Sequence, residues 1–536
     1  MIRTPHAELA ALLIAAALPA SLSISAAGTG PQFYTLSDFE RALPGHPLSS
    51  HGSVHLYAGG GEYQAFQIAI PAPPSGLTIT GVTSSDLAGA GGRKIPASNV
   101  TIYREHYVHV DSPSPDRHGT NRTMGAGWYP DALIPFRDPD SGKPLAGRYR
   151  GVPFHLDRSD SDHEPLGTFT LWIDIFVPRG TAPGDYHATI TLSSDRGKIE
   201  VPWSITVWRF DVPLKPSLRS SMLFWNPVDE GAVEELLRHR LMPQHVPSGT
   251  PSVERRLETS LGLSMSGTDF WSGADNSHCS MKPPPARNEL ERAVRSHDPN
   301  LWLFNYTADE IGNCKGLYPA LKEWGRALHQ ANIKNLVVMG PVPELFNDGT
   351  GHPVVDVWVL LPMQFENDSS VIAAARAHGS EIWSYNAAVQ DAYSPKWLID
   401  YDTLGYRLQA GFLNQTYGLT GLLYWRIDRW DGDPWTHINN TGVFSSGNYP
   451  GEGLLLYPGD PVGLPKGAAP SIRLKQLRAG VQDYEYVEML KHLHRGDWAL
   501  GRIRTVAPDW KNWSRSGEAV EAVRRELGDE INKLSP

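Results

Sequence analysis

Leu301-Trp302-Leu303-Phe304-Asn305-Tyr306-Thr307-Ala308-Asp309-Glu310 is the stretch that decides the fold. Its mostly apolar and aromatic start is typical of a strand buried on both faces, and it ends in two adjacent carboxylates. Gly312 follows, so the chain is expected to turn directly after the acids. The same dipeptide occurs at Asp229-Glu230 and Asp529-Glu530, but in helix-like contexts where a solvated acidic face is expected. Asp309-Glu310 is thus distinguished by the strand that leads into it.

Length and composition indicate a multidomain globular protein. The 536 residues exceed one ordinary domain, and 40% apolar with 20% charged residues is a globular balance. The 51 glycines and 44 prolines favour many loops and β-structure. A formal net charge of -10 argues against a nucleic-acid partner. The 17 tryptophans and 20 tyrosines mildly favour a carbohydrate ligand, because flat aromatic rings can pack against the C–H faces of sugars. Packing in the core is the ordinary use of these residues.

The N-terminus has the pattern of a secretory signal peptide over residues 1–27. Arg3 precedes an apolar stretch from Leu9 to Leu18, and small residues through Ala27 provide a cleavage site. The apolar stretch is too short for a stable membrane anchor. We therefore expect export to the periplasm or the extracellular space, without a membrane anchor.

Cys279 and Cys314 are the two cysteines of the chain. Outside the cytoplasm such a pair can form a disulfide, which here would tie the loop around Cys279 to the acidic loop; two buried free thiols are the alternative. Neither cysteine belongs to a Cys-x-x-Cys pair and His-Glu-x-x-His is absent, so no metal site is expected. No organic cofactor is expected either.

Residues 28–215 are predicted to form an antiparallel β-sandwich. Tyr63–Ile70 and Leu171–Val177 alternate in polarity, and turn residues lead into further strands at His187–Leu192 and Val201–Val207. Pro213–Pro216 then has the composition of a linker.

Residues 216–495 are predicted to form a (β/α)8 TIM-like barrel, because strand and helix patterns alternate and no dinucleotide-binding glycine motif is present. Two strands, near Leu241 and Leu263, are weakly signalled. The chain is expected to be mainly helical after Pro470, with Ser471 starting a helix at the end of the barrel region. Residues 496–536 are predicted as a C-terminal helical extension, whose last helix starts at Ser516. The other expected strands are Ser221–Trp225, Leu301–Tyr306, Asn335–Met339, Val355–Leu360, Glu381–Tyr385 and Gly421–Trp425, and the expected helices are Ala286–Val294, Tyr318–Leu328, Val371–Ala377 and Thr403–Gln415.

The position of Asp309-Glu310 suggests catalysis, because active sites of barrels lie at the C-terminal ends of the strands. Neighbours on a strand point to opposite faces, so both acids reach one site only if the strand is already bending into a loop. An ordinary glycosidase needs carboxylates that flank the scissile bond. Adjacent acids fit substrate assistance instead: one carboxylate stays ionised and holds a 2-acetamido group, and the other, with a raised pKa, donates a proton. A structural salt bridge at the strand end is the alternative.

Spaced blocks in order along the chain resemble glycoside hydrolase family 123, the β-N-acetylgalactosaminidase group, and a related uncharacterised domain with the same barrel half. The blocks are Trp128–Pro135, Leu171–Pro178, Pro183–Tyr186, Tyr306 with Asp309-Glu310, Val355–Trp358, Glu381–Tyr385, Gly421–Trp425, Leu456–Gly459, Ser471–Leu474 and Arg478–Tyr486.

The resemblance implies an exo-acting enzyme that removes terminal β-linked N-acetylgalactosamine with retention of configuration. Asp309 would polarise the acetamido group and Glu310 would be the general acid/base. Ile311 stands where the family commonly has proline, which puts fine substrate choice in question. Hexosaminidases of family 20 also use an adjacent Asp-Glu pair, but the His-x-Gly-Gly run that usually precedes it is missing here.

Seven further residues are candidates for sugar binding. Tyr306 belongs to the acidic block, and Tyr385 and Trp425 end late strands where they could wall the pocket; Trp383 alternates with Tyr385. Asp356, early in its strand, could bind a sugar hydroxyl group. The alternative is an ion pair near the N-terminal end of the barrel strands. Trp430 lies in an Asp-rich loop and could form an outer subsite, together with Trp435.

The predicted partner is a glycan or glycoconjugate with a terminal N-acetylhexosamine. One alternative is a glycosidase of other specificity, such as a β-N-acetylglucosaminidase, or one that combines Asp309 or Glu310 with a distant Asp356 or Glu366. A non-catalytic polysaccharide-binding protein is the alternative from another class. The sequence leaves the oligomeric state open.

Overall fold

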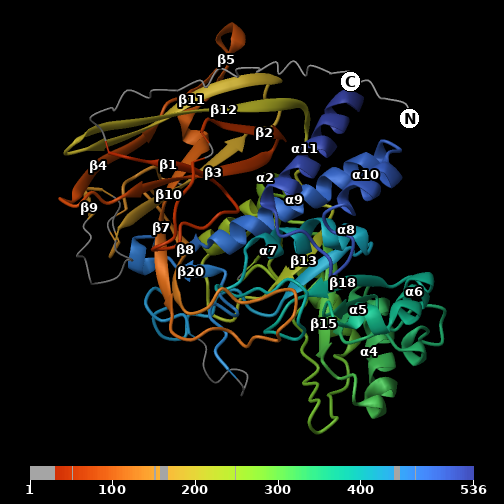
Figure 1. The fold of residues 1–536 in the computed structure, drawn as a ribbon. Coiled ribbons are helices and arrows are strands. Elements are labelled where there is room, and N and C mark those ends of the chain that lie inside the picture. Colours follow the sequence, from red (N-terminus) through yellow and green to blue (C-terminus); the bar gives the residue numbers. More distant parts are fainter. Residues whose placement is uncertain are drawn as a thin grey trace, which may run out of the picture.

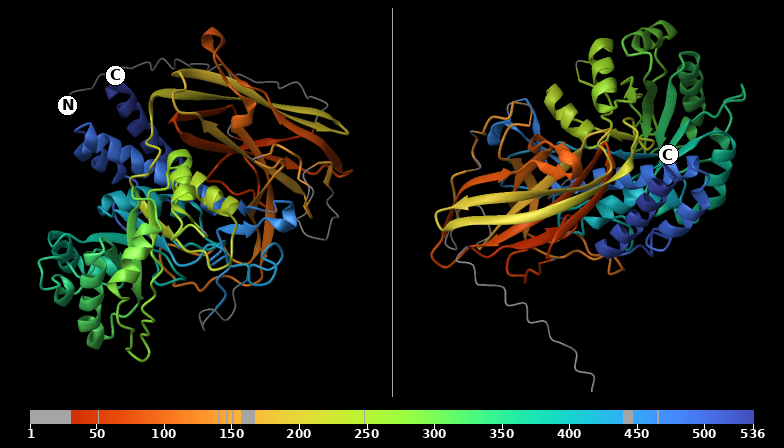
Figure 2. Two further views of the ribbon diagram at one scale, coloured as in Figure 1. Left: turned by 180° about the vertical axis from the view of Figure 1, so that it is seen from behind. Right: turned by 90° about the horizontal axis from the view of Figure 1, so that it is seen from above.

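The computed structural model describes residues 31–536 except 51, 140, 146, 150–151, 157–166, 248, 440–446 and 465. The predicted signal peptide lies outside the described residues. Two stacked β-sheets form the N-terminal part, a parallel sheet ringed by helices forms the central part, and the last helices lie between them (Figures 1 and 2).

The N-terminal sheets are largely antiparallel and share one apolar core. One has the order β1-β3-β10-β7-β8, and the other has the order β2-β12-β11-β4-β9 with β5 and β6 at its side. Only the β2–β12 pairing is parallel among these described strands, a departure from the expected antiparallel pattern. The bounds are β1 Tyr34–Ser37, β2 Val54–Gly60, β3 Glu62–Pro71, β4 Leu77–Ser84, β5 Leu87–Gly89, β6 Lys94–Ile95, β7 Val100–Val110, β8 Gly127–Pro135, β9 Phe154–Leu156, β10 Thr168–Val177, β11 Gly184–Ser194 and β12 Gly197–Asp211.

Alternation explains how these strands build the core. In β12, Ile199, Val201, Trp203, Ile205 and Val207 are buried, whereas the alternating residues Lys198, Glu200 and Pro202 are exposed. The buried set packs against the inner residues of β3 and β10 from the other sheet. The predicted strands over 63–70, 171–177, 187–192 and 201–207 are confirmed within β3, β10, β11 and β12.

The central sheet is parallel, nearly closed, and has the order β13-β19-β18-β17-β16-β15-β14. Its edges approach one another through Met242–Gln244: Met222 donates its N–H to the Met242 carbonyl (3.0 Å), and Gly267 donates to the Gln244 carbonyl (2.6 Å). The strands are β13 Arg219–Met222, β14 Met265–Gly267, β15 Trp302–Asp309, β16 Lys334–Val338, β17 Val357–Leu360, β18 Glu381–Tyr385 and β19 Gly421–Tyr424, and a short hairpin joins β20 Leu456–Pro458 to β21 Ala468–Pro470.

The strand–helix alternation departs from a regular (β/α)8 repeat at one connection. Between β16 and β17 the chain forms only a 3-10 turn, Pro343–Leu345, because prolines at 341, 343 and 353 and the glycines at 349 and 351 interrupt helix formation. The described helices are α1 Glu230–Arg238, α2 Pro251–Leu261, α3 Arg287–Arg295, α4 Tyr318–Gln330, α5 Gln364–Asn367, α6 Ser369–Ala377, α7 Leu404–Leu408, α8 Asn414–Thr416, α9 Ile472–His492, α10 Gly496–Ile503 and α11 Gly517–Leu534.

The expected helix starts are confirmed at the C-terminal end. The side chain of Ser471 accepts the Leu474 N–H (3.2 Å) and starts α9, and Ser516 accepts the Ala519 N–H (3.2 Å) and starts α11. The two other Asp-Glu dipeptides lie in helical contexts as expected: Asp229 directly precedes α1, which begins at Glu230, and Asp529-Glu530 lies within α11. No described helix is both long and apolar enough to cross a lipid bilayer.

Helix α9 joins the two halves of the molecule through buried ion pairs. Arg473 contacts Asp131 of β8 at 2.7 Å, with both side chains fully buried, and Arg478 and Lys475 pair with Asp174 of β10. Its other face packs against α7 and β19 of the barrel. The charges are satisfied by these partners, as burial requires.

Candidate active site

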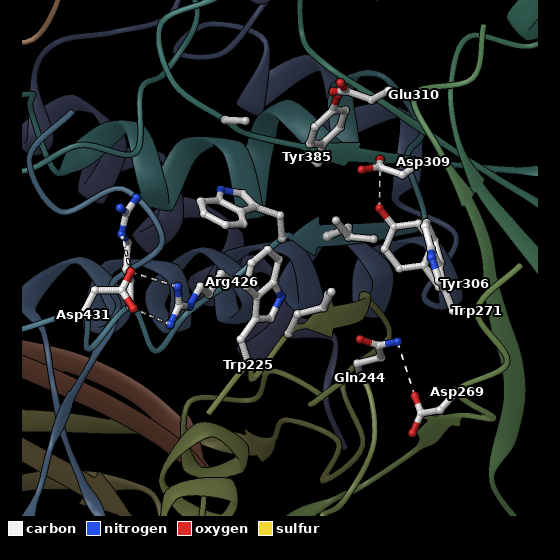
Figure 3. Close-up of a pocket in the computed structure, with 15 residues that line it drawn as sticks. Trp225, Gln244, Asp269, Trp271, Tyr306, Asp309, Glu310, Tyr385, Arg426 and Asp431 are labelled. Atoms are coloured by element: carbon white, nitrogen blue, oxygen red, sulfur yellow. Dashed lines mark hydrogen bonds and ion pairs between the residues drawn. The ribbon is translucent and has the colours of Figure 1, made fainter. Parts of the chain in front are cut away.

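A cavity of about 930 Å3 opens at the C-terminal ends of the barrel strands, and Figure 3 shows Asp309 and Glu310 at its wall. The predicted residues Tyr306, Tyr385 and Trp425 line it together with the two acids. The full lining is Leu223, Trp225, Gln244, Asp269, Trp271, Tyr306, Asp309, Glu310, Tyr385, Ala387, Leu423, Trp425, Arg426, Arg429 and Asp431.

A β-bulge in β15 brings Tyr306 and Asp309 to the same side. Tyr306 pairs with Leu336 of β16, and Ala308 pairs with the next residue, Val337, so Thr307 is an extra residue in β15. Residues three positions apart on a regular strand point to opposite faces of the sheet. The extra residue shifts the alternation by one, so Tyr306 and Asp309 point to the same face. The Tyr306 hydroxyl consequently donates a hydrogen bond to Asp309 Oδ1 at 3.0 Å.

Glu310 faces the cavity beside Asp309 because the chain bends at this residue. Its φ of 48° lies in the left-handed region, which is uncommon for a residue with a side chain. The Glu310 N–H still donates to the Val338 carbonyl (2.8 Å), so the bend begins while the chain remains attached to β16. Such backbone conformations concentrate at functional sites. The expected bending at the strand end is confirmed.

Each acid accepts a hydrogen bond from one tyrosine. Tyr385 at the end of β18 donates to Glu310 Oε1 at 2.9 Å, as Tyr306 does to Asp309. Burial raises the pKa of both phenols far above the ordinary value, and the neighbouring carboxylates act in the same direction, so both hydroxyls remain donors. No described residue donates to Asp309 Oδ2 or Glu310 Oε2, which leaves one oxygen of each acid for a ligand.

The pKa of Asp309 is raised to about 6. Burial by the surrounding protein is the main cause, and the charge of Glu310 adds to it; the hydrogen bond from Tyr306 acts in the opposite direction. A raised pKa was expected for the second acid, whereas in the structure it is the pKa of the first acid, Asp309, that is raised. Asp309 is still mostly ionised at neutral pH.

Comparison with known proteins finds a glycoside hydrolase family that is similar to this chain. Residues 342–490 match the model of the glycoside hydrolase 123 catalytic domain. A family 123 glycoside hydrolase from Clostridium perfringens has the same fold, with a TM-score of 0.64 at 12% sequence identity over 94% of this chain and 98% of that chain. The chain is a glycoside hydrolase that resembles family 123.

More distant structures are also found. The β-glucuronidase of Parabacteroides merdae is 10% identical over 74% of this chain and 48% of that chain, with a TM-score of 0.27. A putative β-galactosidase from Bacteroides fragilis is 11% identical over 69% and 53% of the two chains, with a TM-score of 0.25. These similarities are too low to inform the site. No curated protein sequence matches the chain significantly.

Three predicted sugar-binding residues of this glycoside hydrolase lie outside the cavity lining, which corrects their predicted role. Asp356 precedes β17 and pairs with His329 (2.7 Å) and Lys334 (3.0 Å) at the opposite end of the barrel, as its alternative interpretation held. Trp383 is fully buried in the barrel interior beside Trp302. Trp430 donates its indole N–H to the Leu456 carbonyl (2.8 Å) and packs in the core.

Two more residues from the sequence argument are also structural. Trp435 is 1% exposed and packs against Tyr457, so it forms no outer subsite. Glu366 pairs with Lys511 at 2.6 Å and does not line the cavity. Ile311, the departure from the family proline, is buried in the core behind the acids.

Several residues that line the cavity were missed. Trp225 has 60% of its surface exposed and ends a predicted strand, which was a usable signal. Its ring meets that of Trp425 edge to face at 5.2 Å, and the guanidinium of Arg426 lies over it at 5.1 Å. Asp431 belongs to the Asp-rich loop after Trp425. Gln244, Asp269 and Trp271 follow the weakly signalled strands, so no pattern marked them.

Cys279 and Cys314 form a disulfide, which was one of the two expected outcomes. It ties the loop after β14, which carries Asp269 and Trp271, to the loop after Glu310. Two walls of the cavity are therefore covalently connected. Among the described residues, His, Cys, Asp and Glu side chains form no group that could hold a metal ion.

Proposed function

We propose that this glycoside hydrolase is an exo-acting β-N-acetylgalactosaminidase that retains configuration by substrate assistance. The observation that carries the proposal is the pair Asp309-Glu310, whose adjacent side chains face one cavity and are each held by a tyrosine. From the same side of the sugar, one acid of such a pair can bind the acetamido group while the other protonates the glycosidic oxygen. The preference for the galacto configuration rests on the resemblance to family 123.

In the first step, the acetamido carbonyl oxygen of the substrate attacks the anomeric carbon and forms an oxazolinium ring. Asp309 Oδ2 accepts the acetamido N–H and stabilises the positive charge that develops on the ring. Glu310 transfers its proton from Oε2 to the glycosidic oxygen as the bond to the leaving alcohol breaks. The tyrosines hold the other oxygen of each acid, so both carboxyl groups are oriented before the substrate binds.

In the second step, the Glu310 carboxylate removes a proton from water, and the water oxygen attacks the anomeric carbon. The oxazolinium ring opens, the acetamido group is restored and Glu310 is again protonated. Two inversions at the anomeric carbon give net retention.

A second candidate is a glycosidase that uses a flanking carboxylate. Asp269 and Asp431 line the same cavity, but both are engaged: Asp269 contacts His245 at 3.0 Å, and Asp431 contacts Arg426 and Arg429 at 3.2 and 3.1 Å. Ion pairing keeps an acid ionised, so neither residue is suited to donate a proton, and an oxygen that contacts a cationic side chain is less free to attack the anomeric carbon.

A panel of aryl β-glycosides tests the proposal. We expect turnover of the N-acetylgalactosaminide, weaker turnover of its glucosamine epimer and none of the 2-hydroxy galactoside. Comparable turnover of the 2-hydroxy sugar would favour a flanking carboxylate, and glycan binding without any turnover would favour a binding protein. The Clostridium perfringens relative is described in terms of glycolipid glycan hydrolysis, so glycolipid glycans are the first natural substrates to test.

We also propose that the protein is exported, on the basis of its N-terminal pattern and its disulfide. Fractionation of expressing cells checks this proposal: mature protein that begins after Ala27 is expected outside the cytoplasm. Full-length protein confined to the cytoplasm would contradict it.

A further inference from the structure

We propose that Glu452 is a positioning residue for the reaction, and that it fixes two walls of the active-site cavity with one carboxylate. This proposal rests on the proposed function, because it assigns Glu452 to the same cavity. Glu452 lies four residues before β20, and its side chain is fully buried. It does not line the cavity itself.

The two oxygens of Glu452 bind two different strand-end loops. Oε1 accepts the indole N–H of Trp425, which follows β19 and lines the cavity, at 2.7 Å. Oε2 accepts the backbone N–H of Ala388 at 3.0 Å. Ala388 follows the cavity residue Ala387. The carboxylate therefore fixes an aromatic wall and the neighbouring loop relative to each other.

The loop held through Ala388 leads back to the catalytic pair. Ala388 has a φ of 49°, a left-handed conformation that needs support from its surroundings. Three residues before it, Tyr385 donates its hydrogen bond to Glu310. A displacement of this loop would consequently disturb the tyrosine that orients the acid.

Close packing reinforces the hold on Trp425. Gly453 has a φ of 73°, and a Cβ there would lie 3.1 Å from Trp425 Cζ2. The hydroxyl of Tyr424 also contacts Glu452 Oε1 at 3.4 Å and accepts the Gly453 N–H at 2.9 Å. Trp425 is therefore fixed both at its indole nitrogen and along its ring edge.

Substitution of Glu452 tests the proposal. Glu452→Ala removes the hydrogen bonds to Trp425 and Ala388 and the contact with Tyr424. We expect kcat on the aryl N-acetylgalactosaminide to fall roughly 10- to 100-fold, as for a displacement of about 1 Å at the reacting centre. Glu452→Gln keeps one acceptor oxygen and should lose less. Asp400→Asn is the matched control, because Asp400 is an equally buried acid that binds Ser114 and Thr123 outside the cavity lining. Equal kcat losses in Asp400→Asn and Glu452→Ala would overturn the proposal.

A double-mutant cycle distinguishes positioning from general destabilisation. Trp425→Phe keeps an aromatic six-membered ring but removes the pyrrole ring with its N–H, so Glu452→Ala should cost less in that background than in the wild-type protein. Strictly additive losses would show that Glu452 does not act through Trp425.

A spectroscopic readout separates this proposal from the proposed function. In protein with 15N-labelled tryptophan, the Trp425 indole signal is identified by its absence from Trp425→Phe. We expect Glu452→Gln to shift this signal and Asp400→Asn to leave it unchanged. If the wild-type protein hydrolyses no glycoside, the proposed function fails while the signal still reports the contact. An unshifted signal in Glu452→Gln would refute the contact and the positioning role with it.

Discussion

The hydroxyl of Tyr306 reaches Asp309 Oδ1 at 3.0 Å although the two residues lie three positions apart on one strand. The bulge at Thr307 makes this contact possible, and the left-handed backbone of Glu310 adds the second acid to the same wall. Two local irregularities in β15 thus assemble the catalytic pair that the proposed mechanism needs.

Asp309→Asn should lower kcat/KM for the aryl N-acetylgalactosaminide by roughly 100-fold or more, because a neutral amide cannot stabilise the oxazolinium charge. Thermal unfolding should change little, since Asp309 faces the cavity. Asp229→Asn is the control: it changes the first residue of another Asp-Glu dipeptide, on the surface at the start of α1. Wild-type activity of Asp309→Asn would exclude the mechanism.

Glu310→Gln should lose least on substrates with good leaving groups. A leaving alcohol of low pKa needs little protonation, so the first step tolerates the loss of the acid. The measurement is kcat/KM for a series of aryl glycosides, and its dependence on leaving-group pKa should steepen in the variant. The same loss for every leaving group would argue against Glu310 as the general acid.

The acidic limb of the pH profile should report Asp309. Because the carboxylate must be ionised, activity should fall as the pH drops through about 6. Tyr306→Phe removes a hydrogen bond that lowers the pKa of Asp309, so the limb should move to higher pH. Tyr401→Phe is the control, since its hydroxyl contacts Pro115 away from the cavity. A limb that stays in place in Tyr306→Phe would contradict this assignment.

Asp131→Asn should destabilise the protein by about 3–5 kcal/mol, because it leaves the buried guanidinium of Arg473 without its anionic partner. Urea unfolding measures the loss. Arg502→Ala breaks the exposed pair with Glu526, whose side chains are 39% and 44% exposed, and should cost about 0–1 kcal/mol. Similar losses in the two variants would show that α9 does not depend on the buried pair.

The double variant Cys279→Ser/Cys314→Ser should lower stability by roughly 2–4 kcal/mol, as expected for opening a covalent loop of moderate length. It should also raise KM, since the loop with Asp269 and Trp271 is then released from the loop after Glu310. Non-reducing mass spectrometry of peptides checks the bridge itself. An unchanged KM would limit the disulfide to a stabilising role.

Much of the barrel could be predicted because its strands are apolar throughout. The strand at Glu381–Tyr385 was predicted with its observed bounds, and α3, α4 and α6 lie within two residues of their predicted positions. The missing helix between β16 and β17 was not foreseen, although the prolines and glycines there are unfavourable to one. The short segments around Met242 and β14 carried too few residues for a clear pattern.

The site could be predicted only in part. Alternation placed Trp383 on the same face as Tyr385, but it does not show how far a side chain lies from the cavity. Trp383 comes two residues before Tyr385, which places it about 6.6 Å further from the C-terminal end of the strand. At that depth its side chain is fully buried. Asp356 precedes its strand, so it lies at the end away from the cavity. Gln244, Asp269 and Trp271 enter the site through loops, whose paths depend on tertiary contacts rather than on periodicity.

The buried helix α9 has a consequence for any attempt to shorten this enzyme. It begins beside Asp131 of the sandwich half and continues along the barrel, so a cut at the linker near residue 215 would leave Arg473, Lys475 and Arg478 without their carboxylate partners. Such a fragment would also expose Ile472, which packs against Leu133 and Trp172 of the N-terminal sheets, and newly exposed apolar surface promotes aggregation. The barrel should therefore be expressed together with the N-terminal sheets.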